Sequence, residues 1–106
     1  MFSPKFESIS VQDLKKINKK SINILDVREP SEYEGAHIPN AKNVPLKTLI
    51  KSPADYITDK AYIVCQSGSR SKKVTNKLYK KYNVINVTGG TNAYGKEYSL
   101  IRKIKR

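Results

Sequence analysis

The chain has 106 residues, 38% of them apolar, which suits a single domain with a buried core over residues 1–106, ending in a basic tail at 98–106. Its one cysteine excludes an internal disulfide, and its one histidine argues against a metal site. The lack of a long apolar run or signal peptide predicts a cytoplasmic protein without membrane contact. The net charge of +12 is concentrated in residues 60–106, which hold twelve basic residues and one acid, and this favours an anionic molecule or partner near that half.

Short helices and one buried strand are expected in the first half of the chain. A capping-box pattern at Ser10 precedes a helix that ends near residues 18–20. Residues 22–27 are predicted as a buried strand, and Ser31 is expected to cap a one-turn helix over 32–34. A loop over 35–43, an extended piece over 44–46, a helix over 46–51 and a turn over 53–57 complete this half.

The second half alternates strands with helices. Strands are predicted over 61–65 and 84–87, with a helix over 71–82 between them. A turn over 88–90, a helix over 92–98 and a frayed tail over 102–106 follow. This alternation predicts an α/β protein with a mostly parallel sheet and helices on both faces. In such sheets the functional crevice lies at the carboxyl ends of the strands.

Cys65 stands at that end of a predicted strand. The polar loop that follows it contains Gly68 and leads onto the N-terminus of the predicted helix. This strand–loop–helix arrangement directs backbone N–H groups toward an anion at its centre, so it stabilises a thiolate and lowers the thiol pKa. Cys65 is therefore the candidate nucleophile.

Three separated segments resemble one family. The first comprises Asp26-Val27-Arg28-Glu29, Glu32-Tyr33 and Gly35-Ala36-His37-Ile38-Pro39-Asn40-Ala41. The second is Cys65-Gln66-Ser67-Gly68-Ser69-Arg70-Ser71, and the third is Gly89-Gly90-Thr91-Asn92-Ala93-Tyr94. In this order and spacing they resemble the rhodanese family over roughly residues 6–98. Asn40 replaces a frequent second glycine and Tyr94 a usual tryptophan.

The resemblance implies a single-domain sulfurtransferase with the small, three-layer rhodanese-like fold. Cys65 would take a sulfane sulfur from thiosulfate or another persulfide donor and hold it as a persulfide. A thiophilic acceptor would then remove it: cyanide in an assay, a thiol or protein cysteine in the cell. We expect no cofactor, no bound metal, no direct nucleic-acid substrate and a monomer.

Each residue of the loop has an expected role. The persulfide cradle is assigned to Gln66, Ser67, Gly68, Ser69, Arg70 and Ser71. The N–H groups of residues 66–70 would face the terminal sulfur, Gly68 would allow tight closure, and the serine hydroxyls would add donors. Arg70 would grip a sulfonate or fix the loop through a carboxylate. Asp26 and Arg28, on the neighbouring strand, would orient loop groups in a supporting role.

Lys72 and Lys73 occupy the first turn of the predicted helix after the loop. Positive charge there opposes the helix dipole and costs a few tenths of a kcal/mol. We interpret the pair as strengthening the positive field on Cys65, which would lower the thiol pKa and attract thiosulfate.

Other functions fit the sequence less well. A phosphatase or arsenate reductase would need five residues between cysteine and arginine, whereas four separate Cys65 from Arg70. A sulfur- or redox-sensing or partner-binding module without catalysis remains the principal alternative. Binding of RNA by the basic half has no recognisable module in its support.

Overall fold

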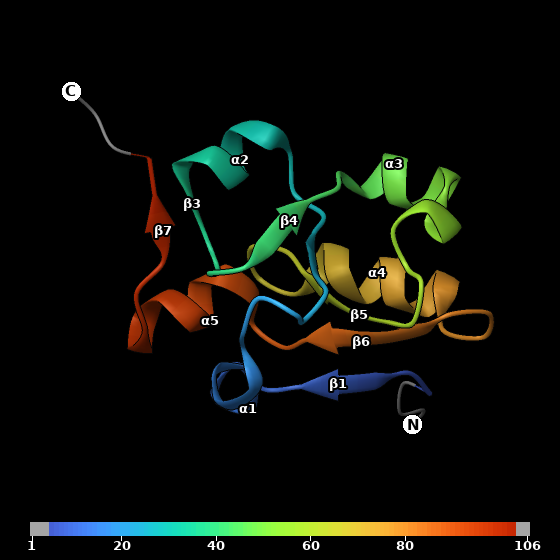
Figure 1. Cartoon of the computed structure of the whole chain (residues 1–106), viewed down its shortest axis with the longest axis horizontal. Helices are drawn as coiled ribbons and strands as arrows, with labels where there is room; N and C mark the ends of the chain where they lie inside the picture. The colour runs from blue at the N-terminus through green and yellow to red at the C-terminus, as the bar shows by residue number, and fades with distance from the viewer. Residues whose placement is uncertain (1–4, 104–106) are drawn as a thin grey trace.

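The computed structural model describes residues 5–103, which form a twisted sheet flanked by short helices (Figure 1). The strands are β1 (Glu7–Ile9), β2 (Ile24–Asp26), β3 (Ala36–His37), β4 (Ala41–Asn43), β5 (Lys60–Val64), β6 (Asn83–Val87) and β7 (Ile101–Arg102). The helices are α1 (Val11–Ile17), α2 (Pro30–Gly35), α3 (Leu46–Lys51), α4 (Ser69–Leu78) and α5 (Gly90–Glu97), with a 3₁₀ turn η1 (Pro53–Asp55).

The main sheet has the strand order β1-β6-β5-β2-β4, and all of its neighbouring pairs are parallel. β5 is the central strand, with β2 and β6 on either side. Because the strands are parallel, the segments that follow β2, β5 and β6 emerge at the same edge. β3 and β7 form a separate antiparallel pair. The predicted α/β class with a mostly parallel sheet is confirmed.

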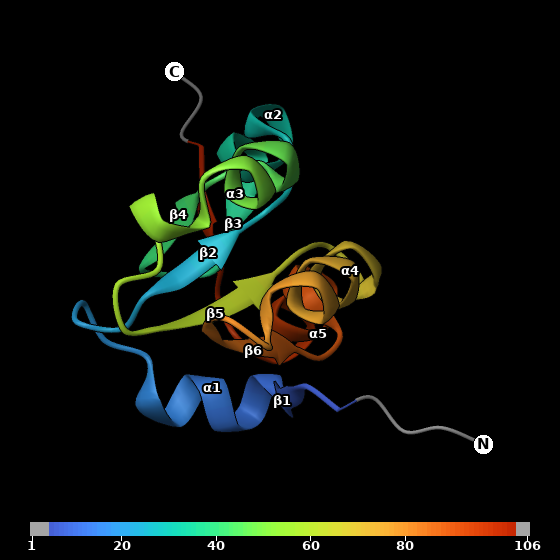
Figure 2. The same cartoon turned by 90° about the vertical axis from the view of Figure 1, so that its right-hand side faces the viewer.

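Two apolar clusters cover the two faces of the sheet. On one face, Leu49 of α3 and Val74 of α4 pack with Ile63 of the central strand. On the other face, Leu14 of α1 and Tyr94 of α5 pack in a second cluster. Figure 2 shows α3 and α1 on opposite sides of β2 and β5. Helices therefore lie on both faces, as predicted, and no helix among residues 5–103 is long and apolar enough to cross a membrane.

Several predicted elements of the first half need correction. α2 begins at Pro30 with Glu29 as its N-cap, so Ser31 does not cap it. The strand predicted over 22–27 is limited to β2, and the predicted loop over 35–43 contains β3 and β4. β4 pairs with β2 through the sequence Ala-Lys-Asn, which has no apolar alternation, so its strand character comes from pairing alone. The cap at Ser10 is confirmed, because its side chain accepts the Asp13 N–H at 3.0 Å.

The helices of the second half begin earlier than predicted. α4 begins at Ser69 instead of 71 and ends at Leu78 instead of 82, and α5 begins at Gly90 instead of 92. In each case a glycine in the left-handed region starts the helix, Gly68 with φ 106° and Gly89 with φ 78°. The predicted frayed tail is also wrong at Arg102, which pairs with Ala36, while its last residues, 104–106, lie outside the described residues.

The two departures from the family pattern have a structural account. Asn40 has φ 71°, a left-handed conformation that asparagine tolerates better than other residues with a side chain. Its side-chain amide also donates to Asn18 Oδ1 at 2.9 Å. Tyr94 is 1% exposed in the cluster on the α1 and α5 face, so the smaller ring still serves as a core residue.

Candidate active site

Cys65 directly follows the central strand β5 and has no exposed surface. It contributes to the apolar cluster under α3 and α4, where a cysteine would ordinarily be inert. Its sulfur, however, is surrounded by hydrogen-bond donors as well as by carbon.

The loop after Cys65 folds back over the sulfur. The N–H of Gly68 donates to Cys65 Sγ at 3.1 Å, and the N–H of Ser71 donates to it at 3.3 Å. The Ser71 hydroxyl lies 3.6 Å from the same sulfur. Gly68 has φ 106°, a left-handed conformation in which a residue with a side chain would be strained. This conformation turns the chain so that it folds back over the sulfur. Of the predicted cradle, Gly68 and Ser71 thus contact the thiol sulfur itself.

The hydrogen bonds decide the charge of the thiol. Burial by itself raises the pKa of Cys65, because a thiolate is poorly solvated in the interior. Hydrogen bonds from the Ser71 side chain and from the backbone of Ser71, Gly68 and Arg70 stabilise the thiolate and outweigh burial. The net effect lowers the pKa below its ordinary value, in the direction that makes a cysteine nucleophilic.

Ser71 is itself held by a residue that the sequence analysis missed. Its hydroxyl donates to Oδ1 of Asn86 at 2.7 Å, and the carbonyl of Gly68 is a second acceptor at 3.1 Å. Asn86 lies fully buried on β6, between the apolar residues Ile85 and Val87. An asparagine among the apolar residues Val84, Ile85 and Val87 was the available signal, because a buried amide needs polar partners.

Arg70 fixes the loop to another part of the chain. Its two terminal nitrogens donate to the two carboxylate oxygens of Glu32 in α2, at 2.8 and 2.9 Å. The hydrogen bonds from Arg70 are the main cause of a pKa of about 2 for Glu32, against an ordinary 4.5. Of the two roles predicted for Arg70, fixing the loop through a carboxylate is the one seen. Glu32 belongs to the first of the three segments that resemble the rhodanese family, but no role was predicted for it.

Asp26 and Arg28 pair with each other instead of orienting the Cys65 loop, so that expectation needs correction. Arg28 Nη2 lies 2.8 Å from Asp26 Oδ2, and both residues are buried. The same nitrogen donates to the carbonyl of Ala36 at 2.7 Å. Because they are two residues apart at the end of β2, the pair closes locally and ties this strand end to β3.

The glycine pair after β6 shapes the Cys65 loop from the other side. The N–H groups of Thr91 and Asn92, at the start of α5, donate to the carbonyls of Cys65 and Gln66 at 2.9 and 3.0 Å. A Cβ on Gly90 would overlap the Cys65 carbonyl and lie 2.7 Å from that of Gln66. With its carbonyls held on α5, the loop is left with N–H groups that face the sulfur.

Comparison with known proteins agrees with this geometry. The profile of the Rhodanese-like domain family matches residues 10–97. The chain belongs to the rhodanese-like family. The rhodanese-related protein of Thermoplasma volcanium has a crystal structure that superimposes with a TM-score of 0.82 at 31% identity, covering 91% of this chain and 98% of that one.

Curated relatives carry names from sulfur chemistry. The thiosulfate sulfurtransferase GlpE of Pseudoalteromonas translucida is 28% identical, over 95% of this chain and 98% of its own length. The putative sulfur carrier protein YrkF of Bacillus subtilis is 43% identical over 67% of this chain. This rhodanese-like chain spans 40% of the length of YrkF and 60% of that of YqhL, an uncharacterized B. subtilis protein that is 39% identical to it.

The other predicted cradle residues of this rhodanese-like loop face outward. Gln66, Ser67 and Ser69 are exposed, and their side chains make no hydrogen bond to another described residue. Beside Arg70 lies a cavity of about 250 Å³, which is lined by Val27, Glu29, Pro45, Leu46, Lys47 and Arg70. No group of acidic, histidine or cysteine side chains within residues 5–103 is arranged to hold a metal.

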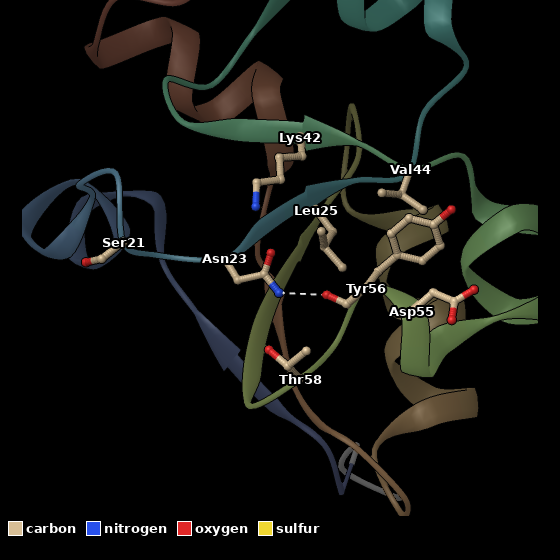
Figure 3. A pocket seen from close by; sticks show the side chains of 8 residues that line it. All are labelled: Ser21, Asn23, Leu25, Lys42, Val44, Asp55, Tyr56 and Thr58. Carbon is tan, nitrogen blue, oxygen red and sulfur yellow. Dashed lines mark hydrogen bonds between the residues drawn. The ribbon is translucent and has the colours of Figure 1, made fainter.

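A second cavity lies toward the opposite ends of the strands. It measures about 360 Å³ and is shown in Figure 3. Asn23 and Thr58 line it and precede β2 and β5, and the Asn23 side-chain amide donates to the Tyr56 carbonyl at 2.9 Å. It includes neither Cys65 nor any cradle residue, so it is separate from the site around the thiol.

Proposed function

We propose that this chain is a sulfurtransferase that carries a sulfane sulfur on Cys65. The observation that supports the proposal best is the pair of backbone N–H groups, from Gly68 and Ser71, that donate to the buried sulfur. Such donors stabilise a negative charge that stays on sulfur throughout the reaction. Membership of the rhodanese-like family and the names of the GlpE and YrkF relatives support the same chemistry.

The first half-reaction forms one sulfur–sulfur bond and breaks another. The Cys65 thiolate attacks the outer sulfur of thiosulfate, and sulfite leaves with the electron pair of the broken bond. Cys65 then carries a persulfide whose terminal sulfur bears the negative charge that the thiolate lost. The N–H groups of Gly68 and Ser71 donate to Cys65 Sγ and so stabilise the attacking thiolate, and the loop that carries them would surround the outer sulfur after transfer.

The second half-reaction needs a nucleophile from outside. Cys65 is the only cysteine of the 106 residues, so no second thiol of the chain can attack the persulfide. Cyanide would remove the outer sulfur as thiocyanate, and a thiol would remove it as a new persulfide; both return Cys65 to the thiolate. We propose thiosulfate or a persulfide as donor, and a thiol or protein cysteine as acceptor.

Intact-mass spectrometry tests the proposal directly. The protein is treated with thiosulfate, then with cyanide, alongside Cys65→Ser. We expect the wild type to gain the mass of one sulfur and to lose it as thiocyanate, while Cys65→Ser stays unchanged. If thiosulfate does not load the thiol, the protein is treated with a low-molecular-weight persulfide instead. Loading by this second donor alone would restrict the sulfur donor to persulfides. If neither donor loads it, sulfur transfer is wrong and a sensing or binding role replaces it.

A further inference from the structure

Three polar side chains form a continuous hydrogen-bond chain behind the sulfur of Cys65. Ser71 Oγ lies 3.6 Å from the sulfur and donates to Asn86 Oδ1 at 2.7 Å. The side-chain amide of Asn86 donates in turn to the hydroxyl of Ser8 on β1 at 3.3 Å. Ser71 and Asn86 have no exposed surface, whereas Ser8 is exposed. The chain therefore runs from the buried sulfur through β6 to the protein surface.

Counting hydrogens shows that this arrangement suits a neutral thiol. A hydroxyl has one hydrogen, and that of Ser71 is engaged by Asn86, so its lone pairs remain for the sulfur. The S–H of Cys65 donates to Ser71 Oγ. Every link then points away from the sulfur: thiol to Ser71, Ser71 to Asn86, and Asn86 to Ser8.

A thiolate needs the opposite direction. An anionic sulfur has no hydrogen to donate, and it is stabilised when Ser71 donates its hydroxyl hydrogen to it. That leaves Asn86 Oδ1 without its donor, which is costly for a buried polar atom. If the side-chain amide turns over, however, its N–H donates to Ser71 Oγ and its oxygen accepts from Ser8. Oxygen and NH₂ are similar in size, so the exchange needs no added space.

We propose that Asn86 is a positioning residue that reverses this hydrogen-bond chain whenever Cys65 becomes anionic. The reversal breaks no O–H or N–H bond, and the thiol proton leaves to solvent. In both directions the Ser71 hydroxyl and the oxygen and nitrogen of the Asn86 amide each have a partner, so the buried site accepts either charge state. The inference rests on the proposed function only in taking the anionic sulfur as the working form of Cys65.

The charged groups around the thiol take no part in this chain. Arg70 is held by Glu32, and Asp26 by Arg28. Lys72 and Lys73 of α4 are exposed, β6 carries no charged residue, and the first turn of α5 has no acidic one. The variants below leave all of these groups in place, so a change in the ionisation of Cys65 is attributable to the hydrogen-bond chain.

The first test follows the Asn86 side chain itself. In NMR spectra of the wild-type protein, we expect the two side-chain amide proton signals of Asn86 to shift with pH at the midpoint at which Cys65 ionises. Ser71→Ala should abolish that shift, because it removes the link between sulfur and amide, and so should Cys65→Ser. Signals of Asn86 that stay constant through the Cys65 midpoint would overturn the proposal without any variant having to fold.

The second test is a double-mutant cycle read through alkylation of Cys65 by iodoacetamide across pH. Asn86→Leu and Ser71→Ala should each raise the midpoint, Ser71→Ala by about one unit. The double variant should match Ser71→Ala alone, because Asn86 acts only through Ser71. Additive shifts would contradict this. Thr75→Val is the matched control: Thr75 is equally buried on α4 and donates to the Ser71 carbonyl, but it lies outside the chain, so the midpoint should stay in place.

Neither test uses a sulfur donor. A failure of sulfur loading in the mass measurement would therefore leave the reversal intact, and a failure of the reversal would leave the sulfur transfer intact.

Discussion

Two neighbouring strands of the sheet end in the same local structure but use it differently. After β5 and after β6, a short loop leads through a left-handed glycine, Gly68 or Gly89, into a helix. Each helix start presents backbone N–H groups without a partner in the helix. At α5 these groups bind the carbonyls of Cys65 and Gln66. At α4 the N–H of Ser71 donates to the sulfur of Cys65.

The difference lies in what each helix start faces. At the start of α5, the N–H groups of Thr91 and Asn92 bind neutral carbonyls and hold the Cys65 loop in shape. The start of α4 faces the sulfur of Cys65, which gains negative charge, and its backbone N–H groups lower the thiol pKa. The loop between β6 and α5 therefore holds the Cys65 loop in the conformation that stabilises the thiolate. Substitutions in the two loops should have separable effects.

The largest effect is expected from Gly90→Ala. The added Cβ would overlap the Cys65 carbonyl, so the loop has to move away from α5. We expect sulfur loading to fall by at least about 100-fold and the free energy of unfolding by about 3 kcal/mol. Gly35→Ala is the control, because a Cβ there meets nothing within 4 Å. Mass spectrometry and urea unfolding measure the two effects, and a fully active Gly90→Ala would refute the role given to α5.

Replacing the two glycines that precede α4 and α5 separates the loops most directly. Gly68→Ala and Gly89→Ala should each lower the free energy of unfolding by about 1–3 kcal/mol, because alanine is strained at φ 106° and φ 78°. Of these two glycines, only Gly68 donates its N–H to the sulfur, so only Gly68→Ala should raise the thiol pKa markedly. The pH dependence of Cys65 alkylation measures this. Equal shifts in both variants would show that the loops are not separable.

The pair between Arg70 and Glu32 should make stability depend on acid pH. The pKa of Glu32 is lowered in the folded state from 4.5 to about 2, so its contribution is complete above pH 4.5 and is lost as pH falls toward 2. Glu32→Gln should flatten the decline of the unfolding free energy in this window. Because the pair is about one-third exposed, we expect a change of about 1 kcal/mol at most.

Urea unfolding between pH 2 and pH 6 measures the change in Glu32→Gln. Glu34→Gln, at an exposed position of the same helix, should leave the decline in place. An unchanged slope in Glu32→Gln would mean that Arg70 does not hold the loop through this carboxylate in solution.

The smallest effect is expected from charge on the outside of the reactive loop. Lys72→Glu with Lys73→Glu should raise the thiosulfate KM several-fold and the thiol pKa by a few tenths of a unit, because it weakens the positive field at Cys65. The effect is small because both lysines are exposed and screened by salt. Lys80→Glu with Lys81→Glu changes the net charge equally, beyond the far end of α4, and should do less. If both pairs act alike, net charge rather than the local field attracts the donor.

Local sequence patterns predicted many of the secondary-structure elements. The apolar runs that became β5 and β6, the cap at Ser10 and the helix over 46–51 were all predictable, because each depends on residues a few positions apart. The short strands β1 and β4 were not. β1 received no prediction and β4 was assigned to a loop, since a strand this short shows no period and forms only because a partner lies beside it.

The candidate site divides in the same way. Cys65 and its loop are contiguous in sequence, so their place at the end of a strand and their resemblance to the rhodanese family could be recognised directly. The partners of the loop could not. Glu32 lies 38 residues from Arg70, and Asn86 lies 15 residues from Ser71.

Sequence alone thus predicts that the thiol lies at a strand end and is followed by a loop rich in hydrogen-bond donors. Tertiary structure alone decided that Arg70 is fixed by Glu32, that Gln66 binds α5 through its carbonyl, and that Ser71 reaches Asn86. The physical reason is register. Backbone conformation follows from neighbouring residues, whereas contact between distant side chains requires β2, β5 and β6 to pair in one alignment, which the packing of both sheet faces selects.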